Sequence, residues 1–141
     1  MRFMLLMIPK GYETAPPGTM PEDVPRIEAM MKYNESMQQA GILLACDGLH
    51  PPSMGARVSF PKGKPVVTDG PFAESKEVLG GYWVIRVASR QEAIDWASRC
   101  PASDTEVIEV RQVQEMEDFP DAAQEAIASI AGMQEQGQQK S

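Results

Sequence analysis

Apolar residues along the chain fall into four short runs that predict the strands of a sheet. The first two runs are almost continuously apolar, and their length fits a buried strand rather than a membrane span or a signal-peptide core. The last two alternate between apolar and polar positions and are rich in β-branched and aromatic residues. We therefore expect strands at residues 2–8, 42–46, 82–87 and 106–113.

Two helices are predicted between these strands. Over residues 24–40, apolar side chains recur at steps of three and four residues, and Gly41 is suited to a left-handed cap at the end of that helix. The second helix is expected to follow Ser89, because Ser89 and Glu92 form a capping box. Pro101 then stops it.

The order of elements favours one fold class. Residues 57–60 and 65–68 flank a Lys-Gly-Lys sequence and predict a short hairpin. The full order is then strand, helix, strand, hairpin, strand, helix, strand. These two similar halves favour an α+β, ferredoxin-like plan, in which an antiparallel sheet carries both helices on one face.

The face of this sheet that the helices leave open is expected to be mixed in character. One side of the third main strand combines a tyrosine, a valine and an arginine, namely Tyr82, Val84 and Arg86. One side of the last strand alternates in the same way, with Val107, Glu109, Arg111 and Val113. Such a face suits a dimer interface or a ligand cleft better than open water, so we expect a homodimer.

Charge and composition exclude several classes of function. The chain has a net charge of −7 and no basic patch of the kind that neutralises phosphates, which argues against nucleic-acid binding. Cys46 and Cys100 lie far apart, so two buried free thiols in a reducing compartment are expected rather than a disulfide. Because no apolar run fits a membrane span or an export signal, we expect a cytoplasmic protein without a membrane partner.

The acidic charge is concentrated at the C-terminal end. Residues 114–141 contain six acids and one base, and we predict that they form an extension to a domain at residues 1–113. A short helix ending near Ala131 is expected to dock through its apolar residues, Phe119, Ile127 and Ile130. The glutamine-rich residues 132–141 have almost nothing to bury and are expected to be disordered.

No motif for a common cofactor or metal site occurs in the chain. Neither of the common glycine-rich nucleotide-binding motifs is present. His50 is the only histidine, which excludes sites with several histidine ligands, and the two thiols have no companion ligands nearby. We therefore expect no cofactor and no metal.

The most distinctive motif lies between residues 67 and 85. It consists of Asp-Gly-Pro-Phe at 69–72, Glu74, Lys76, Glu77 and Gly-Gly at 80–81. The flanks add Ala-Gly-Ile-Leu at 40–43, Gly-Leu-His-Pro at 48–51, Gly-Lys at 63–64 and Ile-Glu-Val-Arg at 108–111. Together they closely resemble the DGPF-domain proteins, a branch of the YCII-related family, over about residues 1–113.

This resemblance implies a ferredoxin-like subunit that pairs with a second copy as a dimeric α/β barrel. YCII relatives look like cofactor-independent small-molecule enzymes of the muconolactone-isomerase type, with a His–Asp pair in the cleft. DGPF relatives are often encoded beside, or fused to, extracytoplasmic-function sigma factors. The histidine of the enzyme pattern would fall near Tyr33, and the predicted first helix contains no histidine.

Four residues are candidates for a site. Asp69 and His50 are the catalytic candidates, with Asp69 as a general base and His50 or Arg57 as an electrostatic helper. Arg57 and Tyr82 are the ligand-binding candidates. A structural interpretation stands beside each: Asp69 before Gly-Pro suits a turn, and a lone histidine is usually a surface or hydrogen-bonded residue.

Three functions remain open at this stage. The leading hypothesis is a small-molecule binding or regulatory domain, linked to an extracytoplasmic-function sigma factor pathway. The alternative is a cofactor-independent small-molecule enzyme of the muconolactone-isomerase type that uses Asp69. The third is an interaction module without a ligand. The missing histidine in the first helix favours binding over catalysis.

Overall fold

The main sheet contains four strands, and every pairing in it is antiparallel. The computed structural model describes residues 1–139, with side chains as far as residue 132. The strands are β1 (Arg2–Pro9), β2 (Leu43–Gly48), β5 (Gly81–Arg86) and β6 (Glu106–Gln112), and their order across the sheet is β2-β5-β1-β6. Each lies within about two residues of its predicted range, because the apolar patterns that define them are local.

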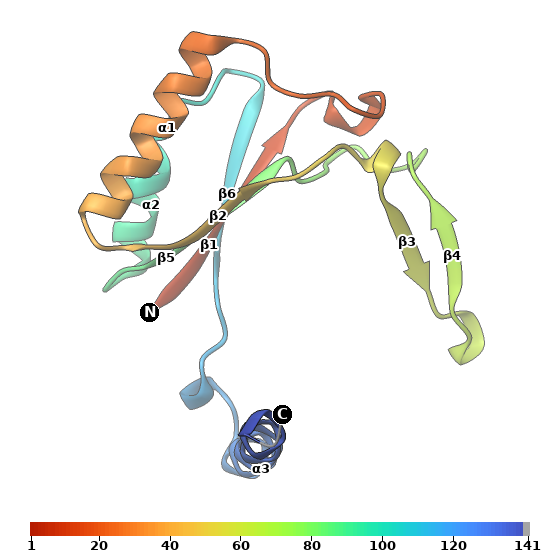
Figure 1. Cartoon of the computed structure of the whole chain (residues 1–141), viewed down its shortest axis with the longest axis vertical. Coiled ribbons are helices and arrows are strands. Elements are labelled where there is room, and N and C mark those ends of the chain that lie inside the picture. The colour runs from red at the N-terminus through yellow and green to blue at the C-terminus, as the bar shows by residue number, and fades with distance from the viewer. Residues whose placement is uncertain (140–141) are drawn as a thin grey trace.

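Helices α1 (Val24–Gln39) and α2 (Arg90–Ser98) cover one face of this sheet (Figure 1). The side chain of Asp23 caps α1 by accepting a hydrogen bond from the backbone N–H of Arg26. Half of the predicted capping box is formed, since the Glu92 backbone N–H donates to the Ser89 hydroxyl. The Glu92 carboxylate accepts from the backbone N–H of Ala88, one residue before the N-cap, and not from that of Ser89. The α+β prediction is therefore confirmed.

The core lies between the helices and the sheet. Alternate residues of β1 and β5 are buried beneath the two helices: Phe3, Leu5, Met7, Trp83 and Ile85. Tyr33 of α1 stacks edge-on against Trp83, with 5.6 Å between the ring centroids, and its hydroxyl donates to the Trp96 carbonyl. Burial raises the pKa of the Tyr33 phenol well above its usual range, so Tyr33 stays a neutral donor.

Both cysteines are free, as the sequence predicted, but they are half-buried rather than buried. Cys46 lies on β2 and Cys100 follows α2, and both pack against the margin of the core. Burial raises the pKa of the Cys100 thiol to about 11, so this thiol carries little thiolate at neutral pH.

No helix of the described residues covers the opposite face of the sheet. Met4 and Leu6 of β1 lie between Val84 and Tyr82 on one side and charged residues of β6 on the other. All four apolar side chains are half-buried within the single chain. The predicted mixture of apolar and charged residues on this face is confirmed, and we call it the open face.

A two-stranded hairpin projects from the body of the molecule (Figure 1). Strands β3 (Ala56–Ser59) and β4 (Val66–Asp69) pair with each other in a separate sheet, and the turn η3 (Pro61–Gly63) joins them. We call residues 56–69 the arm. Every residue of its two strands is exposed in the single chain.

The C-terminal extension differs from its prediction. After the short turn η4 (Met116–Asp118), helix α3 runs from Asp121 to Gln139, well beyond the short helix expected to end near Ala131. Residues 140 and 141 of the expected disordered end lie outside the described residues. Phe119 and Ile127 are half-buried, but Ile130 is 58% exposed, so the prediction that Ile130 docks is wrong for the single chain.

Candidate functional site

A cavity of about 240 Å³ lies where the arm joins the main sheet. Its walls come from three segments: the loop after β2, the first residues of the arm and the loop before β5. The lining is mainly apolar, with one imidazole and one guanidinium: Leu49, His50, Pro51, Pro52, Met54, Gly55, Ala56, Arg57, Phe72, Val78 and Leu79. We call it the base cavity. It brings together two of the four predicted site residues, His50 and Arg57.

The loop that carries His50 is held in place from both sides. The Leu49 backbone N–H donates to the Gly80 carbonyl at 3.0 Å, and the Tyr12 hydroxyl donates to the Leu49 carbonyl at 2.5 Å. Further along, the Ser53 hydroxyl donates to the Ala15 carbonyl at 2.9 Å. These contacts join residues 49–53 to the turn η1 (Tyr12–Thr14) and the loop after it, so the His50 segment has a defined position.

The Asp-Gly-Pro-Phe turn is fitted against the same loop. The Gly70 backbone N–H donates to the Gly55 carbonyl at 2.9 Å. A Cβ atom at Gly70 would lie 1.7 Å from the Pro52 carbonyl oxygen, so no other residue fits at this position. This close approach places Phe72, the last residue of the motif, in the wall of the base cavity.

Arg57 and Phe72 form the polar-aromatic corner of the base cavity. The centre of the Arg57 guanidinium lies 4.1 Å from the centroid of the Phe72 ring, which is cation–π geometry. Among the described residues, no carboxylate forms an ion pair with Arg57. Stacking leaves the planar N–H fork of Arg57 available to an anion, and His50 adds a second polar group to the same lining.

Asp69 and Tyr82 do not line this cavity. Asp69 is exposed at the end of β4, opposite Ala56, and its carboxylate has no hydrogen-bond partner among the described residues. The structural interpretation of Asp69 would have its side chain hydrogen-bond to the backbone of the turn, and that bond is not formed among the described residues.

Tyr82 lies on the open face, where its hydroxyl donates to the Asp47 carboxylate at 2.8 Å. This hydrogen bond and the negative charge of Asp47 raise the pKa of the Tyr82 phenol. Tyr82 and Arg57 thus belong to different surfaces of the chain.

Two residues with a direct role in these arrangements were missed by the sequence interpretation. Phe72 was assigned only to the motif, although an aromatic residue after a fixed turn is a signal for a wall or a stacking partner. Asp47 pairs with Tyr82 across β2 and β5, beyond a register shift between Leu43 and Ala45. That bulge hides the pairing from a simple alternation of residues.

A second cavity of about 440 Å³ also has Phe72 in its lining. Its lining is more polar in composition and comes from η1 and the loop after Pro71: Glu13, Thr14, Pro71, Phe72, Ala73, Ser75 and Lys76. This cavity contains none of the predicted site residues, so the base cavity is the better candidate for the site.

The described residues contain neither a cluster of metal-ligating side chains nor a helix suited to a membrane. Within the part of the chain that the structure describes, no three histidine, cysteine or acidic side chains gather as a metal site would require. No described helix combines the length and the apolar composition needed to cross a bilayer.

Comparison with known proteins assigns the chain to a family. It is 42% identical over 59 residues to an uncharacterized protein of Rhizobium meliloti (strain 1021), an alignment that covers 42% of this chain and 48% of the relative. The chain thus matches about half of the length of that relative. The family model for the YCII-related domain matches residues 1–117, which include the main sheet, both covering helices, the arm and the base cavity. The chain therefore belongs to the YCII-related domain family.

Proposed function

We propose that this protein is a small-molecule binding domain that takes a compact organic acid in the base cavity. The observation that carries the proposal is Arg57, which is stacked on Phe72 and has no ion pair with any described residue. A guanidinium held flat on a ring is well placed to bind a carboxylate through two parallel N–H···O bonds.

The shape and lining of the cavity restrict the ligand further. Its volume of about 240 Å³ is below the range of about 300–1,000 Å³ typical of drug-sized sites, so it suits a small metabolite. Leu49, Val78 and Leu79 offer an apolar wall for the ligand body. The expected ligand is therefore an aromatic or branched aliphatic acid, with its carboxylate on Arg57 and a polar substituent near His50.

We infer that the chain falls in the DGPF branch of the family and that it is a homodimer. The Asp-Gly-Pro-Phe run supports the first inference, since Gly70 and Phe72 both have specific roles at the site. The strand order β2-β5-β1-β6, with both helices on one face, supports a ferredoxin-like subunit. The open face, which combines half-buried apolar residues with charged ones, supports pairing of this subunit with a second copy as a dimeric α/β barrel.

Catalysis by Asp69 is the competing function. Asp69 lies outside the lining of the base cavity and has no hydrogen-bond partner there that would orient it as a general base. Binding without turnover is therefore the function that the geometry supports best. A regulatory output, such as the link to a sigma factor pathway, would follow from ligand occupancy.

Thermal melting with a panel of paired compounds tests the binding proposal. Benzoate and 2-hydroxybenzoate should raise the melting temperature, whereas benzamide, which has nearly the same shape without the charge, should not. Calorimetric titration of Arg57→Gln should show at least about tenfold weaker binding of the acids, because a charge-assisted pair is lost. NMR spectra of the bound acid over hours should show no turnover.

Arg99 provides a matched control. It too is stacked on an aromatic ring, 4.4 Å from the centroid of Trp96, but it does not line the base cavity. Arg99→Gln should leave the affinity unchanged. Equal binding of acid and amide, or equal loss in the two variants, contradicts the proposal. Turnover that disappears in Asp69→Asn would establish the enzyme instead.

A further inference from the structure

Two amphipathic elements keep exposed apolar side chains in the single chain, as far as the structure describes it. One is the arm at residues 56–69, and the other is helix α3. Figure 1 shows them projecting from the body at separate places, with the arm on one side of the molecule and α3 below the sheet. Neither element belongs to the base cavity beyond the first residues of the arm.

The arm has one apolar face that no described residue covers. In the register of β3 and β4, Val58 lies opposite Val67, while Arg57 lies opposite Thr68 and faces the other way. Phe60 continues the face of Val58 and is 66% exposed. An isolated two-stranded hairpin with an exposed apolar face is marginally stable in water, so this face needs a cover.

Helix α3 carries a matching stripe. Ala123, Ile127 and Ile130 recur at steps of four and three residues and share one face of the helix. Ile130 is 58% exposed in the single chain.

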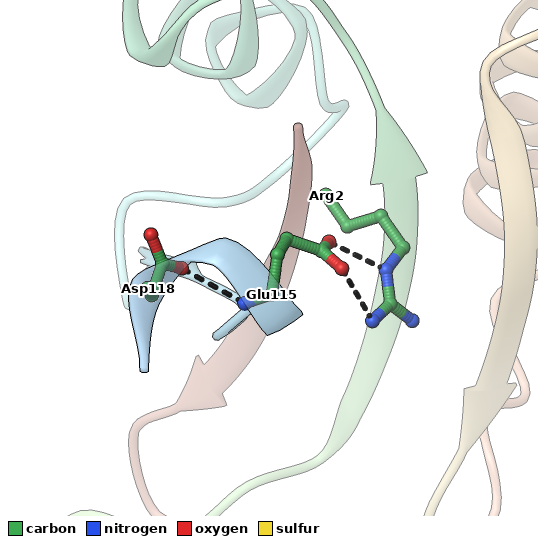
Figure 2. Close-up of polar contacts among 3 residues, drawn as sticks. All are labelled: Arg2, Glu115 and Asp118. Carbon is green, nitrogen blue, oxygen red and sulfur yellow. Dashed lines mark hydrogen bonds and ion pairs between the residues drawn. The ribbon is translucent and has the colours of Figure 1, made fainter. Parts of the chain in front are cut away.

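The start of this extension is nevertheless fixed to the body (Figure 2). The guanidinium of Arg2 donates to both oxygens of the Glu115 carboxylate, at 2.8 and 3.2 Å, and the Glu115 backbone N–H donates to Asp118 at 2.8 Å. A bidentate pair of this kind sets the direction of the segment that follows it. Helix α3 is thus connected to the sheet at its root, while its apolar stripe is only half-buried at Ala123 and Ile127 and is exposed at Ile130.

The net charges of the arm and of the C-terminal extension indicate which surface packs on each of them. The extension at 114–141 has a net charge of −5, so pairing between two copies of α3 would bring like charges together. The arm has three bases, Arg57, Lys62 and Lys64, and one acid, Asp69, so its net charge is +2. Arm and extension are therefore complementary in both charge and apolar surface.

We propose that the arm of each chain packs on helix α3 of a second copy, with its apolar face on the Ile127–Ile130 stripe. The inference rests on the homodimer proposed above and adds a second, charge-matched contact outside the sheet. Since the family model ends at residue 117 and α3 begins at Asp121, this contact is a feature of the extension rather than of the family domain.

Charge reversal in trans tests the proposal on the full chain. Variant A carries Lys62→Glu and Lys64→Glu in the arm, and variant B carries Asp121→Lys and Glu125→Lys in α3. Helix α3 itself, residues 121–139, has a net charge of −3, which becomes +1 in variant B, while the arm changes from +2 to −2 in variant A. Arm and α3 then carry charges of the same sign in each homodimer, so each variant alone should dimerise at least about tenfold more weakly than the wild type by analytical ultracentrifugation. Mixing A with B should restore wild-type affinity, because every arm then meets an α3 of opposite charge.

Phe60→Ser supplies an independent variant that changes no charge, and Met31→Ser is its control, since Met31 is 58% exposed on the outer side of α1. Phe60→Ser should weaken the dimer and Met31→Ser should not. If A and B dimerise like the wild type, or if the mixture is no better than either alone, the arm does not pack on α3 of a second copy. A monomeric wild type would overturn the homodimer itself, so the two failures are distinguishable.

Discussion

Gly70 is the residue at which the chain approaches itself most closely near the site. A methyl group there would overlap the Pro52 carbonyl oxygen. A methyl group at Gly55, in the facing loop, would lie 3.5 Å from the same oxygen, which is an ordinary van der Waals contact. The two glycines thus offer a matched pair in one small region.

Gly70→Ala should destabilise the protein by about 2–4 kcal/mol, because the turn must move away from Pro52. Gly55→Ala should have an effect close to zero, since its backbone is extended and a methyl group fits. Chemical denaturation of the two variants measures the difference. Equal midpoints would show that the turn is not packed as described.

Substitution of Asp69 distinguishes the structural interpretation of the Asp-Gly-Pro-Phe motif from the catalytic one. Because it is exposed and has no hydrogen-bond partner among the described residues, Asp69→Asn should change the free energy of unfolding by less than about 0.5 kcal/mol. Since Asp69 does not line the base cavity, the affinity for acids should also be unchanged. Calorimetric titration and thermal melts of the same variant check both statements, and weaker binding would show that the site extends to the end of β4.

Among the elements, the root of α3 should respond to pH. The hydrogen bond from Arg2, followed by the nearby positive charges, holds the pKa of the Glu115 carboxyl below its usual range. Because the pKa of Glu115 is lower in the folded state, its ionised form stabilises the fold at pH values above the ordinary glutamate pKa of about 4.3. This stabilisation is lost as the pH falls through the lowered pKa of the folded state.

The melting temperature of Glu115→Gln should therefore lie below that of the wild type at pH 7, and the difference should vanish in acid. Glu117→Gln is the control, since Glu117 is exposed in the same turn and forms no ion pair with a described residue. A pH-independent difference for Glu115→Gln would show that the loss concerns packing and not charge.

Strands and helices were largely predictable from the sequence, whereas the base cavity was not. Strand and helix bounds follow from local patterns, and Ser89 caps α2 as expected, although the Glu92 carboxylate accepts from Ala88 rather than from Ser89. The base cavity was not predictable as a whole, because Arg57 and Phe72 meet only after the arm and the Gly70 turn are folded against the Pro52 loop. The length of α3 was underestimated because its glutamine-rich second half has little apolar periodicity.

At the scale of the whole molecule, the open face of the sheet is expected to determine the oligomeric state. Light scattering at micromolar concentration should give about twice the chain mass of 15.5 kDa, with an interface of more than about 1,000 Å² in total. Val84→Glu should yield monomers, because it introduces a charge at the centre of the open face beside Met4. Val24→Glu, at an exposed position at the start of α1, should stay dimeric. A monomeric wild type contradicts this assembly.

The ion pair between Arg2 and Glu115 has an evolutionary consequence. Its two residues are 113 positions apart in the chain and join the first strand to the beginning of the C-terminal extension. Losing either one leaves the other without its partner, so selection acts on both together. In relatives whose chains continue into a helix after residue 117, the two positions should covary, whereas relatives without that helix should vary freely at both. An alignment sorted by chain length would reveal this dependence.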